Sequence, residues 1–79
     1  MPRFFFHLRL EHESTDGEGV ELPDFQSAWS EAVRAFGEML RTGDSSLSPH
    51  SPFEMTIADD AGNPVCRLRF STEMLQQLD

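Results

Sequence analysis

The sequence predicts an α+β domain, in which one amphipathic helix packs on one face of a small, mainly antiparallel four-stranded sheet. Three observations favour this fold class. Apolar residues alternate with polar ones near the start of the chain, recur every three or four residues over 25–40, and alternate again in two segments after residue 52. Period two is typical of half-buried strands, and period 3.6 of a helix with one buried face. The predicted order is β-β-α-β-β.

The first strand is predicted over 3–10. Its even-numbered positions are all apolar, and its odd-numbered positions, which point to the other face, are Arg3, Phe5, His7 and Arg9. Residues 14–17 predict a turn, because Asp16 supplies a side-chain acceptor and Gly17 tolerates a positive φ. A short second strand over 19–22 would return beside the first as a hairpin.

Asp24 is predicted to cap the helix, because its carboxylate can accept a backbone N–H and suits the positive end of the helix dipole. Gly43 stands where a left-handed residue commonly ends a helix. The apolar stripe between them consists of Phe25, Ala28, Trp29, Ala32, Val33, Phe36, Met39 and Leu40. Such a stripe needs a core, so the helix should cover the apolar side of the sheet.

The second half of the chain predicts a loop over 43–52 and two more strands. The strands are expected over 53–58 and 65–70, joined by a turn rich in Asp, Gly, Asn and Pro. Residues 72–79 predict either a short helix or a frayed end. The order of the strands across the sheet is left open by the sequence.

The chain is predicted to form one domain over 1–79, since 79 residues leave room for a single, thin core. The predicted core consists of Phe4, Phe6, Leu8, Phe25, Trp29, Ala32, Val33, Phe36, Leu40, Met55, Ile57, Leu68 and Phe70.

Charge and cysteine content narrow the classes of partner. The chain has 14 acidic and 6 basic residues, all six of them arginine, and a net charge of −8, which opposes binding to nucleic acid or to an anionic membrane. The single cysteine, Cys66, excludes an internal disulfide and a cysteine-based zinc site. A reducing compartment fits, and no signal peptide or membrane span is recognised, so a cytoplasmic protein is expected.

Several short motifs together resemble a known family. They are the opening Met-Pro-Arg-Phe-Phe-Phe-His, the Leu-Pro-Asp step at 22–24, an Asp-x-x-Gly turn at 59–62 and Leu-Arg-Phe-Ser at 68–71. From Pro2 to about Met74 the chain is similar to a family of small bacterial proteins, common in rhizobia and related α-proteobacteria, whose domain has no known function. The resemblance implies a cytoplasmic bacterial origin, but no activity, ligand or catalytic residue. The 43–52 loop is longer and richer in Ser and Pro than expected of that family.

No constellation of residues predicts catalysis or a cofactor. His7, His12 and His50 lack the spacing of metal ligands, and neither acidic segment has the spacing of a calcium loop. Neither a nucleophile elbow nor a phosphate-binding glycine loop occurs. The chain is therefore predicted not to be an enzyme and to have no cofactor or metal site, with the histidines on the surface and Cys66 a buried, unreactive thiol.

One pattern does indicate a binding surface, namely the sheet face that points away from the helix. The candidate residues on it are Arg3, Phe5, His7, Arg9, Arg67 and Arg69, with Val65 beside them. An aromatic and basic face on an otherwise acidic protein suits docking. The alternative is an ordinary solvated face on which arginines pair across strands with Glu54.

Two functions follow from this face. The first is a protein-interaction module that docks an unknown partner or a second copy of itself as a homodimer. The second is binding of single-stranded nucleic acid, with Phe5 and His7 stacking on bases and arginines holding phosphates. The net charge of −8 makes nucleic acid the less favoured partner. No membrane partner is expected.

Overall fold

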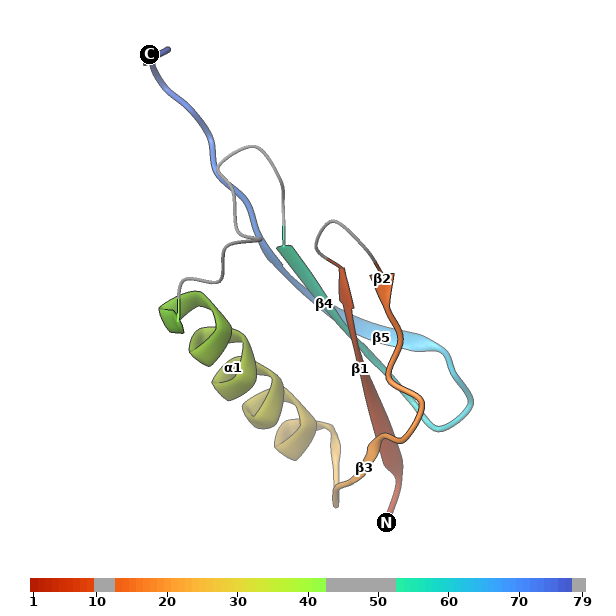
Figure 1. Cartoon of the computed structure of the whole chain (residues 1–79). Helices are drawn as coiled ribbons and strands as arrows, with labels where there is room; N and C mark the ends of the chain where they lie inside the picture. The colour runs from red at the N-terminus through yellow and green to blue at the C-terminus, as the bar shows by residue number, and fades with distance from the viewer. Residues whose placement is uncertain (10–12, 43–52, 78–79) are drawn as a thin grey trace.

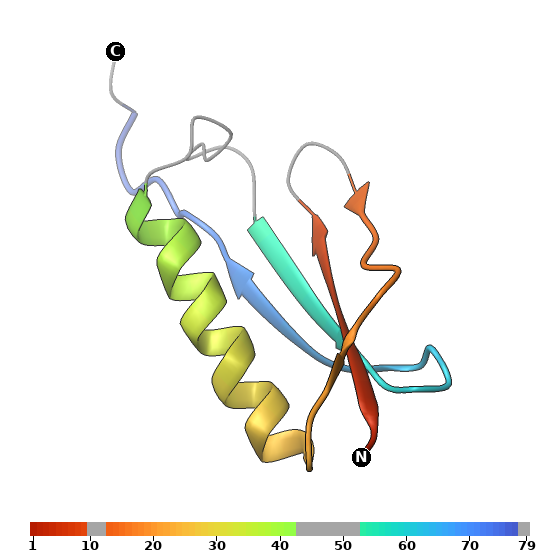
Figure 2. The ribbon, with the colours of Figure 1, turned by 60° about the horizontal axis from the view of Figure 1, so that its bottom comes forward.

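The computed structural model describes residues 1–9, 13–42 and 53–77 and has the predicted α+β class (Figure 1). In chain order the elements are β1 (Arg3–Arg9), β2 (Glu13–Ser14), β3 (Val20–Glu21), α1 (Phe25–Thr42), β4 (Phe53–Ala58) and β5 (Pro64–Phe70). All strand pairs are antiparallel. The helix lies on one side of the sheet, so the molecule has two layers (Figure 2).

The strand order, which the sequence left open, is β2-β1-β4-β5, and β3 also pairs with β1. The two longest ladders join β1 to β4 and β4 to β5, so β4 is the central strand and β5 an outer one. A tight turn joins β4 to β5, as predicted. In it Gly62 has a φ of 86° and donates its N–H to the carbonyl oxygen of Asp59 at 2.9 Å.

The predicted second strand differs from the observed structure, because two short strands occupy the same edge of β1. β3 lies within the predicted 19–22, but β2 begins at Glu13 and includes Ser14, where a turn was expected. Asp16 explains the interruption. Its carboxylate accepts the backbone N–H of Phe6 at 3.2 Å, so a side chain replaces the backbone partner that a continuous strand would supply.

The helix begins where the sequence predicts. Asp24 Oδ1 accepts the backbone N–H of Ser27 at 2.9 Å, which confirms the N-cap. The helix continues to Thr42; Gly43 and the predicted 43–52 loop lie outside the described residues.

The core lies between α1 and the even-numbered face of β1, as predicted. Phe4 and Phe36 are buried, and the ring of Phe36 stacks on that of Phe53 at 4.7 Å between centroids. The buried apolar residues are Phe4, Ala28, Ala32, Phe36, Phe53, Met55, Ile57 and Ala58. Against them pack the partly buried predicted core residues Phe6, Leu8, Leu40 and Leu68. The prediction missed Phe53, which is only 1% exposed.

The core prediction is wrong for four residues, whose side chains are exposed. Phe25, Trp29, Val33 and Phe70 are 43%, 39%, 44% and 37% exposed. The helix meets the sheet through Ala28 and Ala32, both fully buried, whose small side chains allow close approach. Trp29 and Val33 lie about 100° and about 140° around the helix from Ala28, so the apolar stripe is wider than the contact. Phe70 ends an outer strand.

After β5 the chain continues as residues 71–77, which we call the C-terminal arm. These residues are all exposed and contain no helix. Figures 1 and 2 show the arm leaving the body of the domain. Among the residues described, none belongs to a helix that is long and apolar enough to cross a membrane.

Candidate functional site

Strand register arranges the face opposite the helix, here called the open face, in three rows across β1, β4 and β5. The rows are Arg9–Glu54–Arg69, His7–Thr56–Arg67 and Phe5–Ala58–Pro64. Five of the six candidate residues therefore share one face, and the central strand adds Glu54, Thr56 and Ala58 between them. The sequence could not place Thr56 and Ala58 in this site, because their position depends on strand order.

Arg3, the sixth candidate, lies at the end of this face and has local partners. It precedes the part of β1 that pairs with β4, and lies opposite Glu21 of β3. Its Nη1 donates to the carbonyl oxygen of Glu18 at 2.6 Å, and its Nη2 lies 3.2 Å from Glu21 Oε1. These contacts make Arg3 a link between β1 and the following segment.

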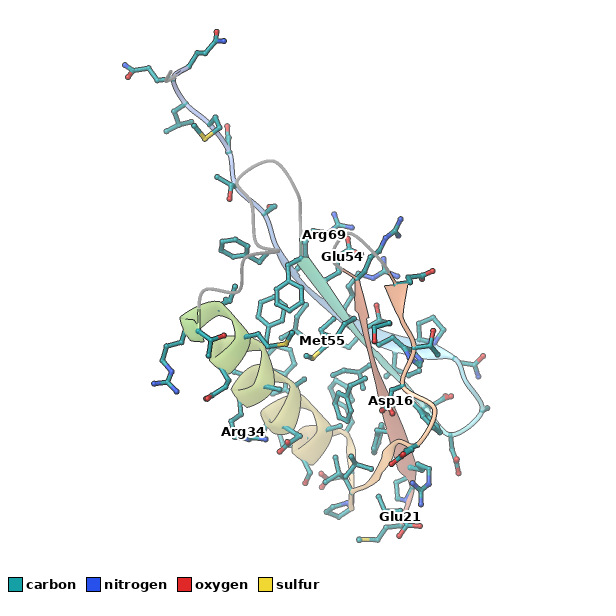
Figure 3. The ribbon with its side chains drawn as sticks, in the orientation of Figure 1. Asp16, Glu21, Arg34, Glu54, Met55 and Arg69 are labelled. Carbon is teal, nitrogen blue, oxygen red and sulfur yellow. The ribbon has the colours of Figure 1, made fainter. Side chains whose placement is uncertain are left out.

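Glu54 neutralises one arginine of the open face. Arg69 donates from Nη2 and Nε to Glu54 Oε2 at 2.6 and 2.7 Å (Figure 3). Glu54 is only 8% exposed, so this charge-assisted pair also satisfies a buried carboxylate. The alternative of cross-strand pairing with Glu54 is thus correct for Arg69.

Arg67 is compensated less completely. Its Nε donates to Thr56 Oγ1 at 3.1 Å, and its closest described carboxylate oxygen is Glu54 Oε1, 4.0 Å from Nε. The side chain is 52% exposed. Because a guanidinium has five N–H donors, Arg67 keeps donors for a further partner.

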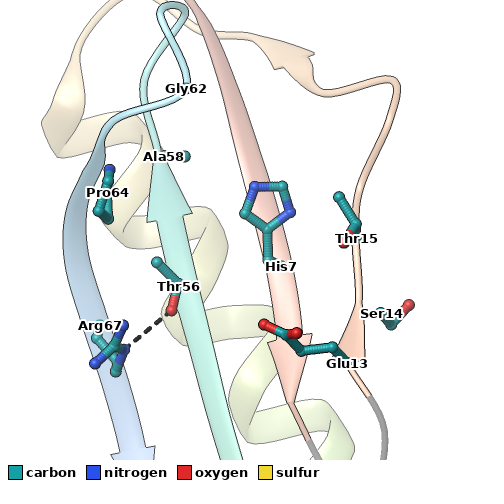
Figure 4. A pocket seen from close by; sticks show the side chains of 9 residues that line it. All are labelled: His7, Glu13, Ser14, Thr15, Thr56, Ala58, Gly62, Pro64 and Arg67. Carbon is teal, nitrogen blue, oxygen red and sulfur yellow. Dashed lines mark hydrogen bonds between the residues drawn. The ribbon is translucent and has the colours of Figure 1, made fainter.

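Arg67 lines a hollow of about 290 Å³ in the open face, which we call the open-face hollow (Figure 4). Its walls come from β1, β4, β5 and the segment around β2. The lining residues are His7, Glu13, Ser14, Thr15, Thr56, Ala58, Gly62, Pro64 and Arg67. The hollow therefore has a mixed lining, with the imidazole of His7 and the guanidinium of Arg67 on opposite sides of β4 and the carboxylate of Glu13 beside them (Figure 4).

A hydrogen bond fixes the tautomer of His7 in its neutral form. The backbone N–H of Asp16 donates to His7 Nδ1 at 3.0 Å, so Nε2 carries the hydrogen. The ring also stacks beside Phe5, at 6.4 Å between centroids. His7 thus offers a second N–H donor on a ring that lines the hollow.

Asp16 fixes the segment that forms this wall. Partial burial acts to raise the pKa of its carboxyl group, but backbone N–H groups of Gly19, Phe6 and Glu18, together with nearby His7, lower that pKa overall below 3.8. The donors from Glu18 and Gly19 lie 3.1 Å from Oδ1. The charged form of Asp16 therefore holds the chain between β2 and β3 against β1.

This segment also covers part of Phe5. Gly19 has a φ of 72°, and a Cβ atom built on it would lie 2.8 Å from Phe5 Cε1. Phe5 is consequently half-buried, so it offers less ring surface for stacking than the sequence suggested.

The remaining candidates for metal or thiol chemistry give no site. Across 1–9, 13–42 and 53–77, no three His, Cys, Asp or Glu side chains converge to hold a metal. His12 and His50 lie outside these ranges. Cys66 is half-buried on the helix side, where a fully buried thiol was expected.

A comparison with known protein families shows which family the chain belongs to. A family model described as "Domain of unknown function (DUF6894)" matches residues 3–71. The chain belongs to this family. The match runs from the first residue of β1 to the residue after β5, so it includes the whole open face. Neither the curated proteins nor the solved structures give a significant match. Bacterial origin stays a prediction.

Proposed function

We propose that this domain is a non-catalytic, cytoplasmic protein-interaction module, whose open-face hollow binds a carboxylate presented by a segment of a partner protein. The observation that carries the proposal is the state of Arg67. Its side chain lines the hollow and is half exposed, and the closest described carboxylate oxygen, from Glu54, is 4.0 Å from its Nε. A second positive side chain, Arg9, lies on the same face.

The donors around the hollow suit a carboxylate. Guanidinium and imidazole N–H groups form strong hydrogen bonds to carboxylates, and the hydroxyl groups of Thr15 and Thr56 can donate as well. Glu13 also lines the hollow and repels a second carboxylate, but it lies opposite Arg9, whose positive charge offsets it. A volume of about 290 Å³ is at the lower limit for small-molecule sites, and a single acidic side chain needs less space. The net charge of −8 repels strongly acidic chains, so a segment with one or two carboxylates fits best.

A homodimer made through the open face itself is disfavoured. A two-fold contact uses the same surface on both copies. It would bring Arg9 and Arg67 of one copy toward the same arginines of the other, and like charges in contact are unfavourable. The hollow therefore favours a differently charged surface as its partner.

The test uses a fluorescent peptide of alanine and serine with one central glutamate, and measures binding by anisotropy at low and high salt. Arg67→Gln should weaken binding by about tenfold, because it removes the charge at the hollow. Arg34→Gln is the matched control: it makes the same change on the exposed surface of α1, where Arg34 pairs with Glu31. A peptide with glutamine in place of glutamate should not bind.

Two results would contradict the proposal. One is that the glutamate peptide does not bind the wild-type domain at low salt. The other is an equal loss of binding in Arg67→Gln and Arg34→Gln, since that would indicate a general charge effect. A single-stranded oligonucleotide serves as the comparison: if only it bound, and Arg67→Gln abolished the binding, the nucleic-acid alternative would replace this proposal.

A further inference from the structure

We propose that two copies of this chain pair through β5 and the C-terminal arm, with residues 65–75 of each copy running antiparallel and symmetric about Phe70. This goes beyond the proposed function, because it concerns the free edge of β5. The pairing would engage Arg67, which also lines the open-face hollow, and the Met74→Cys and Val65→Asp tests below leave Arg67 unchanged, so the two proposals are tested separately. The partner is a second copy of the chain.

The first observation is the combination of a free edge and an apolar arm. β5 is the outer strand of the described sheet, so the backbone groups on its outer side have no strand partner. The arm that continues from it is exposed along its length, and Met74 and Leu75 are 48% and 87% exposed. Figures 1 and 2 show the arm extending beyond the sheet.

The second observation is that the segment complements itself in one register. In antiparallel pairing about Phe70, residues at equal distances before and after it lie opposite one another. The resulting pairs are Val65 with Leu75, Cys66 with Met74, Arg67 with Glu73, and Phe70 with Phe70 of the second copy. Paired residues share a face of the sheet, because positions of equal parity do so along each strand.

This register gives a partner to every strongly exposed large apolar side chain of the segment. Val65 and Phe70 are 49% and 37% exposed and, like Met74 and Leu75, gain an apolar neighbour. The register also places the carboxylate of Glu73 opposite Arg67, whose Nε is bonded to Thr56 while its other donors are available.

Charge disfavours pairing that is centred on Leu68 in the second half of β5. Symmetry about Leu68 would place Arg67 opposite Arg69 of the second copy, and like charges directly opposite destabilise a sheet. Arginines on an outer strand usually protect it from such pairing. Moving the centre to Phe70 replaces this repulsion with the attraction of Glu73, so the arm selects the register.

A disulfide test reports on the register directly. Met74→Cys places a thiol opposite Cys66 of the second copy, and Cα atoms of facing residues in antiparallel strands lie about 4.5–5.5 Å apart, which a disulfide can bridge. Mild oxidation should convert this variant into a covalent dimer. Leu75→Cys is the matched control: its thiol would lie opposite Val65 and on the other face from Cys66, so it should not form the dimer. Equal cross-linking of the two variants, or none, would overturn the register.

Sedimentation from micromolar to millimolar concentration tests the association itself. The 9.0 kDa chain should form a dimer, and Glu73→Arg should weaken it by about tenfold, with recovery in the Arg67→Glu/Glu73→Arg double variant.

Val65→Asp should disrupt the dimer. Val20→Asp, which changes a valine of similar exposure in β3 at the other edge of the sheet, should leave the dimer intact. A wild-type monomer at millimolar concentration, or a dimer insensitive to Glu73→Arg and Val65→Asp, would refute the proposal, with circular dichroism showing that the variants fold.

Discussion

At the scale of single residues, Asp16 determines the geometry of the candidate site. Its carboxylate accepts three backbone N–H groups, and its own N–H binds His7. One residue therefore ends β2, covers Phe5 through Gly19, and fixes the tautomer of a ring in the open-face hollow through its backbone N–H. Composition indicated only a turn here, because the Phe6 partner lies ten positions away and local turn chemistry does not predict it.

Asp16→Asn should lower the free energy of unfolding by about 1–3 kcal/mol, measured with urea, because an amide can accept only on its oxygen and its NH₂ group would face backbone donors. The pKa of Asp16 is lowered in the folded state, so its charged form stabilises the fold above about pH 4, and this contribution is lost as pH falls below that value. The difference between wild type and variant should therefore shrink at acidic pH. A pH-independent difference would contradict this account.

Gly19→Ala should destabilise the domain by about 1–3 kcal/mol, because φ at this position is 72° and the new Cβ would lie 2.9 Å from the Phe4 carbonyl oxygen and 2.8 Å from the Phe5 ring. Gly17→Ala is the matched control, since a Cβ there meets no atom within 4 Å. Thermal unfolding of both variants checks the prediction. Equal melting temperatures for the two variants would contradict the close packing of Gly19 on Phe5.

At the scale of elements, the helix shows what periodicity can and cannot predict. The spacing of apolar residues identified α1 and its capping residue, and it identified the even-numbered face of β1 as the face beneath it. It did not identify the centre of the stripe, because large side chains such as Trp29 dominate any estimate from hydrophobicity. The contact is made by Ala28 and Ala32, where short side chains let the helix approach.

Ala32→Leu should lower the free energy of unfolding by about 1–3 kcal/mol, because a residue with no exposed surface has no room for a larger side chain and the helix must move away from the sheet. Val33→Leu is the control, since Val33 is 44% exposed, and its effect should stay within about 0.5 kcal/mol. Urea unfolding of the two variants distinguishes them. A larger effect at Val33 than at Ala32 would mean that Val33, and not Ala32, lies at the centre of the contact between helix and sheet.

At the scale of the whole molecule, the two faces of the sheet have different environments: one packs against the helix and the other is the open face. The even-numbered positions of β1 were predicted to form the core, and they lie there. The odd-numbered positions share the opposite face, and binding by that face stays a prediction. The membership of the site was less predictable. Thr56, Ala58 and the β2 segment joined it only because β4 lies beside β1 and the chain after β2 folds back, and neither follows from local sequence.

The most direct test of the central claim is a two-dimensional NMR titration of the wild-type domain with the single-glutamate peptide. The account predicts that the largest shifts occur at His7, Thr56 and the Arg67 side chain, on three adjacent strands of the open face. The largest shifts at Trp29 and Val33 on the helix, or none at any residue, would contradict it.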